Sequence, residues 1–335
     1  MKKAMLVRLL ALVLLTAGAA QPERSEIRVA EQYGLTFLPL MIMRDSRLVE
    51  AHARHLGLPA ARVTWIKLGA VSSINDALLA GELEFAAGGV PSLVTLWSKT
   101  RGTPGEVRGV GALGDVPNEL IVSRPDVKSI RDLGPQDKIA VTAVKISNQA
   151  LALQMAAAKE FGEQQYDRLD PLTVSMAHPD ATVALLSGSG SITGHFSSPP
   201  FMEREVAKPP LHSILSTYDV LGGPATLNVV WTTKQFHDDS PKMYQAFVGA
   251  LEEAMETIGR DKRAAAAVYK RLGNASESLE DIVGMLEDPR IVFTITPHRV
   301  LRTAEFLHRT GRVKNRPASW KDLFFANVHG REGAG

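Results

Sequence analysis

The sequence of 335 residues contains no cysteine. A chain without cysteine forms no disulfide bonds, offers no thiolate to a structural zinc ion, and has no cysteine for a lipid anchor. An excess of charge of one sign is also lacking: 38 Lys and Arg residues stand against 36 Asp and Glu residues. The basic residues are scattered, so we expect no nucleic-acid partner. Stability must therefore come from a large apolar core, which the 45% hydrophobic content can supply.

No apolar run long enough to span a membrane is found after the first twenty residues. The stretch MKKAMLVRLLALVLLTAGAAQ begins with two lysines, continues as an apolar run broken only by Arg8, and ends in small residues. The run is shorter than the ~20 residues that a bilayer requires. This pattern is typical of a secretory signal peptide, cleaved after Ala19 or Ala20, although an uncleaved membrane anchor is the alternative. We expect residues 1–20 to be a signal peptide and the mature protein to be soluble and periplasmic.

Strand and helix patterns alternate along the rest of the chain. Strands are predicted at 26–32, 62–69 and 83–89, with a helix over 38–57 and another over 73–81 that a Ser73–Asp76 capping box opens. The pattern restarts with strands at 137–144 and 172–178 and with helices capped by Ser147 and Asp180. Such alternation predicts an α/β fold with mostly parallel sheets. More than one compact unit is expected for a chain of this length.

One β-α-β unit is used twice. ALLAGELEFAAGG, residues 77–89, aligns without a gap with ALLSGSGSITGHF, residues 184–196, and this places Gly88 opposite His195. Ligands of open α/β sheets bind beyond the carboxyl ends of the strands. Two such lobes facing each other would form a cleft, with His195 and Gly88 on its two walls. His195 is then a ligand-binding residue or a core histidine, and the sequence favours neither.

A second glycine-rich stretch, GVGALG at residues 109–114, matches the dinucleotide-binding pattern G-x-G-x-x-G. That function requires a helix to begin at the third glycine. Asp115, Val116, Pro117 and Asn118 follow instead, and a strand comes next. We therefore predict no bound cofactor. No H-E-x-x-H motif or close histidine pair suggests a metal site, and no spacing suggests a catalytic triad.

The stretches LLAGELEFAAGGVPSL, SIRDLGPQDKIAV, ALLSGSGSITGHFSSPPF and ASWKDLFF resemble periplasmic substrate-binding proteins of ABC transporters, of the nitrate, sulfonate and taurine type. This group includes receptors for thiamine-pyrimidine precursors. The resemblance implies a two-lobed periplasmic-binding-protein fold of type II with a ligand cleft between the lobes. It implies an N-terminal lobe over 25–118, completed by 231–326, and a second lobe over 119–230. It also implies a monomer that delivers its solute to a membrane permease.

The resemblance and the predicted strand ends together suggest which residues bind the solute. These residues follow strands, open helices or lie at the crossing between lobes: Tyr33, Gly34, Ser72, Ser73, Gly88, Gly89, Asn118, Lys145, Ser147, Asn148 and His195. Helix N-termini carry a partial positive charge that suits an oxyanion. A simple capping role is the alternative for Ser73, and a solvated loop position is the alternative for Lys145.

The expected function is that of a solute receptor without enzymatic activity, for a small organic or inorganic anion. The sequence leaves open whether that solute is a sulfonate, nitrate, a carboxylate or a neutral pyrimidine. The alternative is an enzyme on the same fold, similar to a pyrimidine-precursor synthase that consumes an active-site histidine. That chemistry needs iron and an intracellular location, which the predicted signal peptide argues against.

Overall fold

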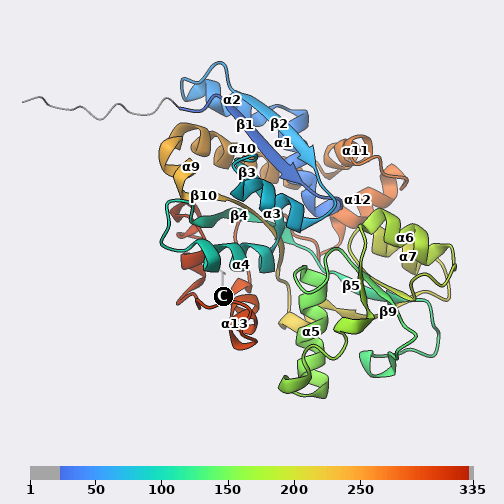
Figure 1. Cartoon of the computed structure of the whole chain (residues 1–335). Coiled ribbons are helices and arrows are strands. Elements are labelled where there is room, and N and C mark those ends of the chain that lie inside the picture. The colour runs from blue at the N-terminus through green and yellow to red at the C-terminus, as the bar shows by residue number, and fades with distance from the viewer. Residues whose placement is uncertain (1–22, 332–335) are drawn as a thin grey trace, which may run out of the picture.

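The structure is a computed structural model that describes residues 23–331, so the predicted signal peptide lies outside the described residues. The chain forms two lobes, each built around one five-stranded sheet (Figure 1). The first sheet has the order β2-β1-β3-β10-β4. Its strands are β1 (Glu26–Glu31), β2 (Arg62–Lys67), β3 (Phe85–Gly89), β4 (Val107–Asp115) and β10 (Thr226–Thr233).

The second sheet repeats this arrangement with the order β7-β6-β8-β5-β9. In each sheet four strands run in the same direction, and the fourth strand in the order, β10 or β5, runs antiparallel to both of its neighbours. The predicted α/β fold with mostly parallel sheets is thus confirmed. The strands of the second sheet are β5 (Glu119–Val122), β6 (Ile139–Val141), β7 (Thr173–Ser175), β8 (Gly194–Ser197) and β9 (His212–Ser216).

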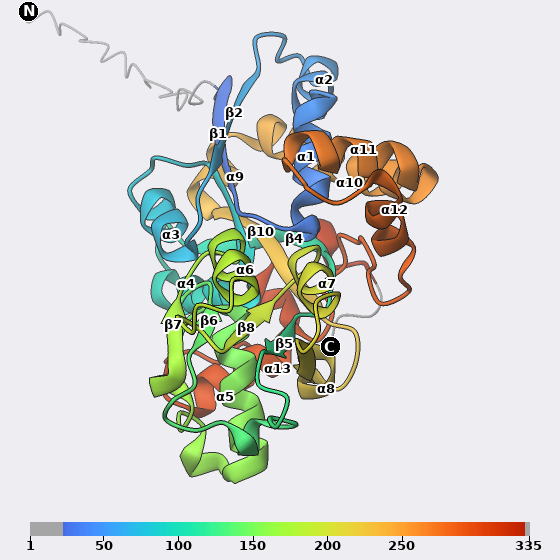
Figure 2. The same ribbon diagram turned by 90° about the vertical axis from the view of Figure 1, so that its right-hand side faces the viewer.

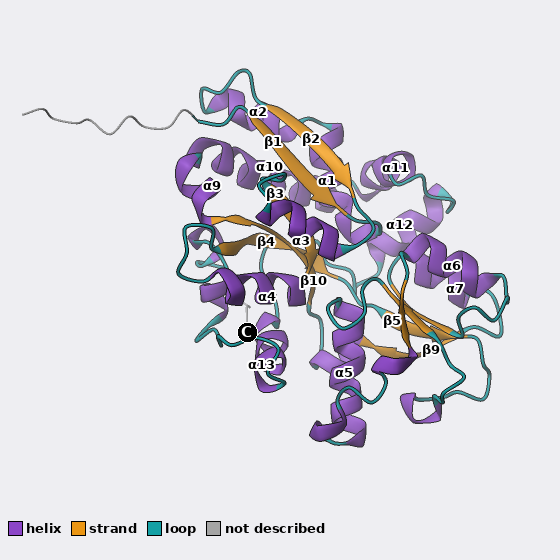
Figure 3. Ribbon diagram, in the orientation of Figure 1, coloured by secondary structure: helices purple, strands orange, loops and turns teal. Residues whose placement is uncertain are grey.

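Helices cover the faces of both sheets (Figure 3). The first lobe carries α1 (Leu38–Asp45), α2 (Leu48–His55), α3 (Val71–Leu79), α4 (Val90–Thr100), α9 (Lys234–Asp239), α10 (Pro241–Arg260), α11 (Lys262–Leu272), α12 (Leu279–Glu287) and α13 (Val300–Arg309). The second lobe carries α5 (Asn148–Phe161), α6 (His178–Leu186), α7 (Phe201–Val206) and α8 (Thr217–Leu221).

The chain crosses between the lobes twice. The first crossing, residues 116–118, joins β4 to β5, and the second, residues 222–225, joins α8 to β10. Since β10 belongs to the first sheet from Thr226 onward, the first lobe resumes a few residues before the predicted position 231. Turning the molecule by 90° shows the second lobe below the first, with α6 and α7 at the junction (Figure 2).

The GVGALG stretch lies within β4, so no helix begins at its third glycine, as a dinucleotide site would need. Its glycines allow the C-terminal segments to pack closely on the strand. A Cβ atom at Gly109 would lie 2.4 Å from the ring of Phe324, and one at Gly111 would lie 2.3 Å from the Ile295 side chain. These distances are far below van der Waals contact, so the glycines serve packing of the first lobe.

Three local predictions were wrong. The predicted helix over 38–57 is two helices, because Arg47 adopts a left-handed conformation with φ of 52°. The break turns α2 onto α10, where the ring of His52 is 2.8 Å from a carboxylate oxygen of Glu253. The Ser73–Asp76 capping box is also absent, because α3 begins two residues earlier, at Val71, and Ser73 lies inside its first turn. Asp180 likewise lies in the first turn of α6, which begins at His178.

Candidate functional site

A small cavity lies between the two lobes, at the edges where the strands of both sheets end. It offers about 30 Å³ of space to a water-sized sphere. The residues that line it are Gln32, Tyr33, Thr36, Phe37, Gly69, Val71, Gly89, Ser92, Asn118, Thr142, Ser147, Asn148, Gln149, His178, Ser198, Leu227 and Asn228. Among these described residues none is Lys, Arg, Asp or Glu, so the lining has amides, hydroxyls and rings but no permanent charge.

Four helices begin at the wall of this cavity. Val71 opens α3, Gly89 immediately precedes α4, Asn148 opens α5 and His178 opens α6, and all four of these residues line the cavity. The helices α3 and α4 belong to the first lobe, and α5 and α6 belong to the second. Each helix start carries a partial positive charge of about half an elementary charge. The electrostatic character of the neutral lining is therefore positive.

Asn118, in the first crossing segment, has a side chain that is fully buried in the cavity wall. Neither its amide nitrogen nor its amide oxygen has a hydrogen-bond partner within residues 23–331. The hydroxyls of Thr36 and Ser92 are buried in the same wall and also have no hydrogen-bond partner within residues 23–331. A buried polar group left unpaired costs about 1–3 kcal/mol. Three such groups around one cavity make it a candidate site for a bound molecule or ordered water.

The lobes touch each other around the cavity. The side-chain nitrogen of Asn148 donates to the backbone oxygen of Leu227 over 2.8 Å, and the backbone nitrogen of Leu35 donates to the oxygen of Pro199 over 2.9 Å. The guanidinium of Arg204, on α7, forms a salt bridge with Glu277 of the first lobe. These contacts join the two lobes directly.

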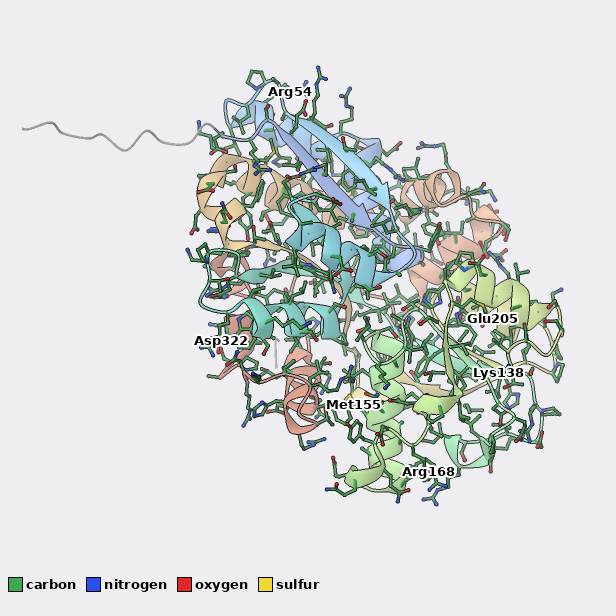
Figure 4. All side chains as sticks on the ribbon, viewed as in Figure 1. Arg54, Lys138, Met155, Arg168, Glu205 and Asp322 are labelled. Atoms are coloured by element: carbon green, nitrogen blue, oxygen red, sulfur yellow. The ribbon has the colours of Figure 1, made fainter. Side chains whose placement is uncertain are left out.

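A buried chain of polar side chains leads from the cavity into the second lobe. His178 lines the cavity and its Nδ1 lies 2.8 Å from Nε2 of His195. Nδ1 of His195 lies 2.6 Å from a carboxylate oxygen of Glu205, which also accepts a hydrogen bond from Thr182. Figure 4 labels Glu205, on α7. Burial, with the neighbouring His195 adding a smaller effect, lowers the pKa of His178 well below its ordinary value.

Comparison with solved structures shows which known fold the chain has. No family model matches the sequence, and no curated protein matches it. The alkanesulfonate-binding protein SsuA from Xanthomonas axonopodis pv. citri, solved with bound MOPS, is 16% identical with a TM-score of 0.68, over 88% of this chain and 96% of that one. The nitrate-binding protein NrtA from Synechocystis PCC 6803 is 16% identical with a TM-score of 0.68, over 90% and 85%.

A third similar structure is the periplasmic aliphatic sulphonate binding protein SsuA from Escherichia coli, 15% identical with a TM-score of 0.62, over 90% of this chain and 92% of that one. The chain has the fold of a periplasmic binding protein. The predicted fold class is thereby confirmed, with two lobes, a sheet in each and a cavity between them.

Five of the eleven residues predicted to bind a solute line the cavity of this binding-protein fold. They are Tyr33, Gly89, Asn118, Ser147 and Asn148. Ser147 also caps α5, because its hydroxyl accepts a hydrogen bond from the backbone nitrogen of Ala150 over 3.2 Å. Ser147 thus both caps α5 and lines the cavity.

The structure places His195 behind the cavity wall. The predicted strand end was too early: β8 continues to Ser197, and the next residue, Ser198, is the one that reaches the cavity. His195 is fully buried and contacts the cavity only through His178.

The other five predicted residues lie outside the cavity lining. Gly88 faces the interior of the first lobe, because successive residues of a strand point to opposite faces and Gly89 faces the cavity. Gly34 lines a neighbouring cavity at the rim. Ser72 and Ser73 are exposed on α3, and Lys145 is exposed with its backbone oxygen bound to Arg312.

Sequence reasoning missed several polar residues of the wall. Gln32, Thr36, Ser92, Thr142, Gln149, His178 and Asn228 all line the cavity. Two signals could have found some of them: Gln149 and Thr142 lie close to Ser147 and Asn148 in the sequence, and His178 is the last residue of a predicted strand. Thr36 and Ser92 lie within apolar stretches and carry no local signal.

Two further observations concern residues 23–331 only. None of the helices there is long and apolar enough to cross a membrane. The same residues bring together no group of three or more His, Asp or Glu side chains with the arrangement of a metal site.

Proposed function

We propose that this protein is a solute receptor that binds a small anion between its lobes and delivers it to an ABC-type permease. The observation that carries the proposal is Asn118, whose buried amide has two unpaired atoms in the wall of the interlobe cavity. An anion that accepts from the amide nitrogen would remove the part of this cost that belongs to the nitrogen when the lobes close over it.

The charge pattern supports an anion with a single charge. Helix starts from both lobes meet at the cavity, and their partial positive charges favour an oxyanion only when both lobes are closed around it. The lining contributes no arginine or lysine within the described residues, so little compensation is available for a second negative charge. Proteins of similar fold are named as sulfonate-binding and nitrate-binding, and the small cavity suits a solute of that size.

Several finer features belong to the same proposal. Tyr33, Gly89, Asn118, Ser147 and Asn148 contact the solute, and the lobes, residues 23–115 with 226–331 and residues 119–221, move about the two crossings. The mature protein is periplasmic and monomeric after removal of the signal peptide. It has no enzymatic activity, so the solute leaves the site chemically unchanged.

A thermal-shift screen on the mature protein tests the proposal. The probes are nitrate, methanesulfonate, taurine and formate, with an aminopyrimidine as the neutral comparison. Buffers must be free of sulfonate groups, which would compete for the site. A ligand at 100 times its Kd should add about 2.7 kcal/mol to the free energy of unfolding.

Two further measurements accompany the screen. Solution scattering should show a smaller radius of gyration with the binding anion than without it, and mass spectrometry should recover the anion intact. The proposal is wrong if none of the anions stabilises the protein, if only the pyrimidine does, or if the solute is converted.

A further inference from the structure

A line of four hydrogen-bonded side chains connects the cavity to a buried carboxylate. Nε2 of Gln149 lies 3.2 Å from Nε2 of His178, and His178 is joined through His195 to Glu205. All four side chains are buried, with exposed fractions of 6% or less. Gln149 and His178 line the cavity, whereas His195 and Glu205 lie behind it.

The carboxylate fixes the hydrogen bond at its own end of the line. The Glu205 oxygen that accepts from the hydroxyl of Thr182 also accepts from Nδ1–H of His195. With both rings neutral, Nε2 of His195 is then an acceptor, and Nδ1–H of His178 donates to it. The remaining nitrogen of His178, Nε2, carries a lone pair toward the cavity and accepts from the amide of Gln149.

Few other ionisable groups approach this line. The elements packed around His178 contribute His195 from β8 and Glu205 from α7, while α5 contributes the neutral Gln149. The ring of Phe201 stacks on His178 with a centroid distance of 5.5 Å. Arg204, which lies over the ring of Phe201, is paired with Glu277.

We propose that the site takes up one proton, on Nε2 of His178, for each anion that it binds. This inference rests on the proposed function and specifies how the neutral lining accommodates a negative charge. A protonated His178 would lie between the anion in the cavity and the carboxylate of Glu205 at the far end of the line. His195 and Glu205 act as positioning residues, since they hold Nδ1 of His178 in the donor role and leave Nε2 as the atom that receives the proton.

His178 can be protonated on Nε2 without losing its hydrogen bonds. The oxygen of the Gln149 amide now accepts from the hydroxyl of Thr142 over 3.0 Å. If the amide turns by half a rotation, its oxygen faces the new Nε2–H and its nitrogen donates to Thr142, which is both donor and acceptor. The Nε2–H donates to the anion or to the turned amide, and in both cases the positive charge lies at the cavity wall.

The pH dependence follows from the two states of His178. In the empty site burial holds its pKa well below the ordinary value of 6.5, so the ring is neutral at pH 7. A bound anion raises that pKa, because it favours the charged form. Affinity is therefore highest at pH values below the pKa of the empty site. Between the two pKa values Kd should rise about tenfold per pH unit, and above the bound-state pKa it should level off.

Isothermal titration calorimetry measures the proton directly. The anion that gives the largest thermal shift among nitrate, methanesulfonate, taurine and formate is titrated into the mature protein in bis-Tris and in Tris. The difference in heat between buffers of different ionisation enthalpy gives the number of protons taken up. We expect a value approaching one at some pH between about 5.5 and about 8, the range in which histidine titrates.

Substitutions assign the proton to the line. His178→Gln should reduce the uptake to zero and flatten the pH dependence of Kd. His195→Gln, which leaves His178 in place, should shift that dependence along the pH axis. His212→Gln is the matched control, because His212 is a hydrogen-bonded histidine of the same lobe outside the cavity, and it should leave the uptake unchanged.

The outcomes separate the two proposals. Tight binding of an anion with no proton uptake at any pH in this range overturns the inference and leaves the receptor function standing. Uptake that persists in His178→Gln also overturns it. If none of the four anions binds, both the receptor function and the inference are wrong. The measurement on the unsubstituted protein decides the matter even if a buried substitution prevents folding.

Discussion

The two lobes share one strand order but fill the space under the cavity with opposite chemistry. In the first lobe, Gly88 of β3 lies against Val71 and Trp231, so an apolar layer backs the wall. In the second lobe, the corresponding strand β8 carries His195, which is bonded to His178 and Glu205. The topology was duplicated, whereas the interior of each lobe was not.

This difference separates two roles within one site. The first lobe contributes the ring of Tyr33, the hydroxyls of Thr36 and Ser92 and two helix starts. Its buried acid Glu31, at the end of β1, is paired with Arg44 and Lys67. The second lobe contributes two helix starts and the ionisable line. Both walls thus contribute helix starts, whereas the unpaired hydroxyls of the lining come from the first wall and the line of histidines from the second.

The largest expected effect is at the residue that belongs to neither sheet. Asn118→Leu replaces an unpaired buried amide by an apolar side chain of similar volume. We expect the empty protein to become more stable by about 1–3 kcal/mol, because the cost of the unpaired amide is removed. We expect anion affinity to fall about a hundredfold, which corresponds to about 2.8 kcal/mol. Chemical denaturation of the empty protein and calorimetry with the anion measure the two quantities.

Asn75→Leu is the control for this substitution. The side-chain oxygen of Asn75, on α3, is also unpaired within the described residues, but Asn75 does not line the cavity. Affinity should be unchanged in Asn75→Leu. Equal losses of affinity in both variants would show that the effect is not specific to the cavity.

The second-largest expected effect comes from substituting adjacent glycines that face opposite sides of β3. A Cβ atom at Gly89 would lie 2.6 Å from the side-chain nitrogen of Asn148 in the other lobe. Gly89→Ala should therefore hold the lobes apart, weaken anion binding about tenfold, or about 1.4 kcal/mol, and reduce the compaction seen by scattering.

Gly88→Ala is the matched variant one residue earlier. Its Cβ would lie 2.9 Å from Val71 and 3.1 Å from Trp231, both within the first lobe. Overpacking of this kind should lower the free energy of unfolding by about 1–3 kcal/mol and leave the compaction on binding intact. An opening effect in Gly88→Ala, or none in Gly89→Ala, would contradict the assignment of the two faces.

The smallest effect concerns the other acidic residue of α7. Burial raises the pKa of Glu203 from an ordinary value of 4.5 to about 7, with Glu119 and Asp288 adding to the rise and Arg290 opposing it. The folded protein then binds a proton more tightly than the unfolded chain, so the free energy of unfolding decreases as pH rises from 4.5 to about 7. Glu203→Gln should remove this decrease and be more stable than the natural protein at pH 8, by on the order of 1 kcal/mol.

Urea denaturation at pH 5 and at pH 8 measures this difference. Proton uptake on anion binding should be the same in Glu203→Gln as in the natural protein, since Glu203 faces the groove beside α12 and not the cavity. A loss of uptake in this variant would assign the proton to the groove between the lobes instead of to His178.

The fold was largely predictable because its signals are local. Apolar strands that alternate with amphipathic helices mark a parallel sheet, and the repeated β-α-β unit marks two lobes. The helix boundaries were less predictable. A left-handed residue such as Arg47 gives no hydrophobic signal, and the start of α3 at Val71 depends on packing, whereas the nearby serines suggested a cap.

The candidate site was predictable only where it follows directly on a strand end or a helix start, as at Gly89, Asn118 and Ser147. Its remaining members depend on three-dimensional packing. Whether His195 lies at the strand end is decided by the length of β8, which continues two residues further to Ser197 in a way that no sequence pattern fixes. Thr36 and Ser92 become polar wall residues only because the second lobe closes over them.

The position of β10 has a consequence for the order in which the two lobes fold as the chain emerges, N-terminus first. This strand lies between β3 and β4 in the first sheet, yet it is made after the whole second lobe, which is one continuous stretch of chain from residue 119 to residue 221. The nascent first lobe therefore lacks a central strand until residues 226–233 emerge. All five strands of the second sheet precede β10 in the sequence, so the second lobe is complete before the first. Domains generally fold as units. We expect the lobe that carries the ionisable line to fold first and the N-terminal strands to wait for it.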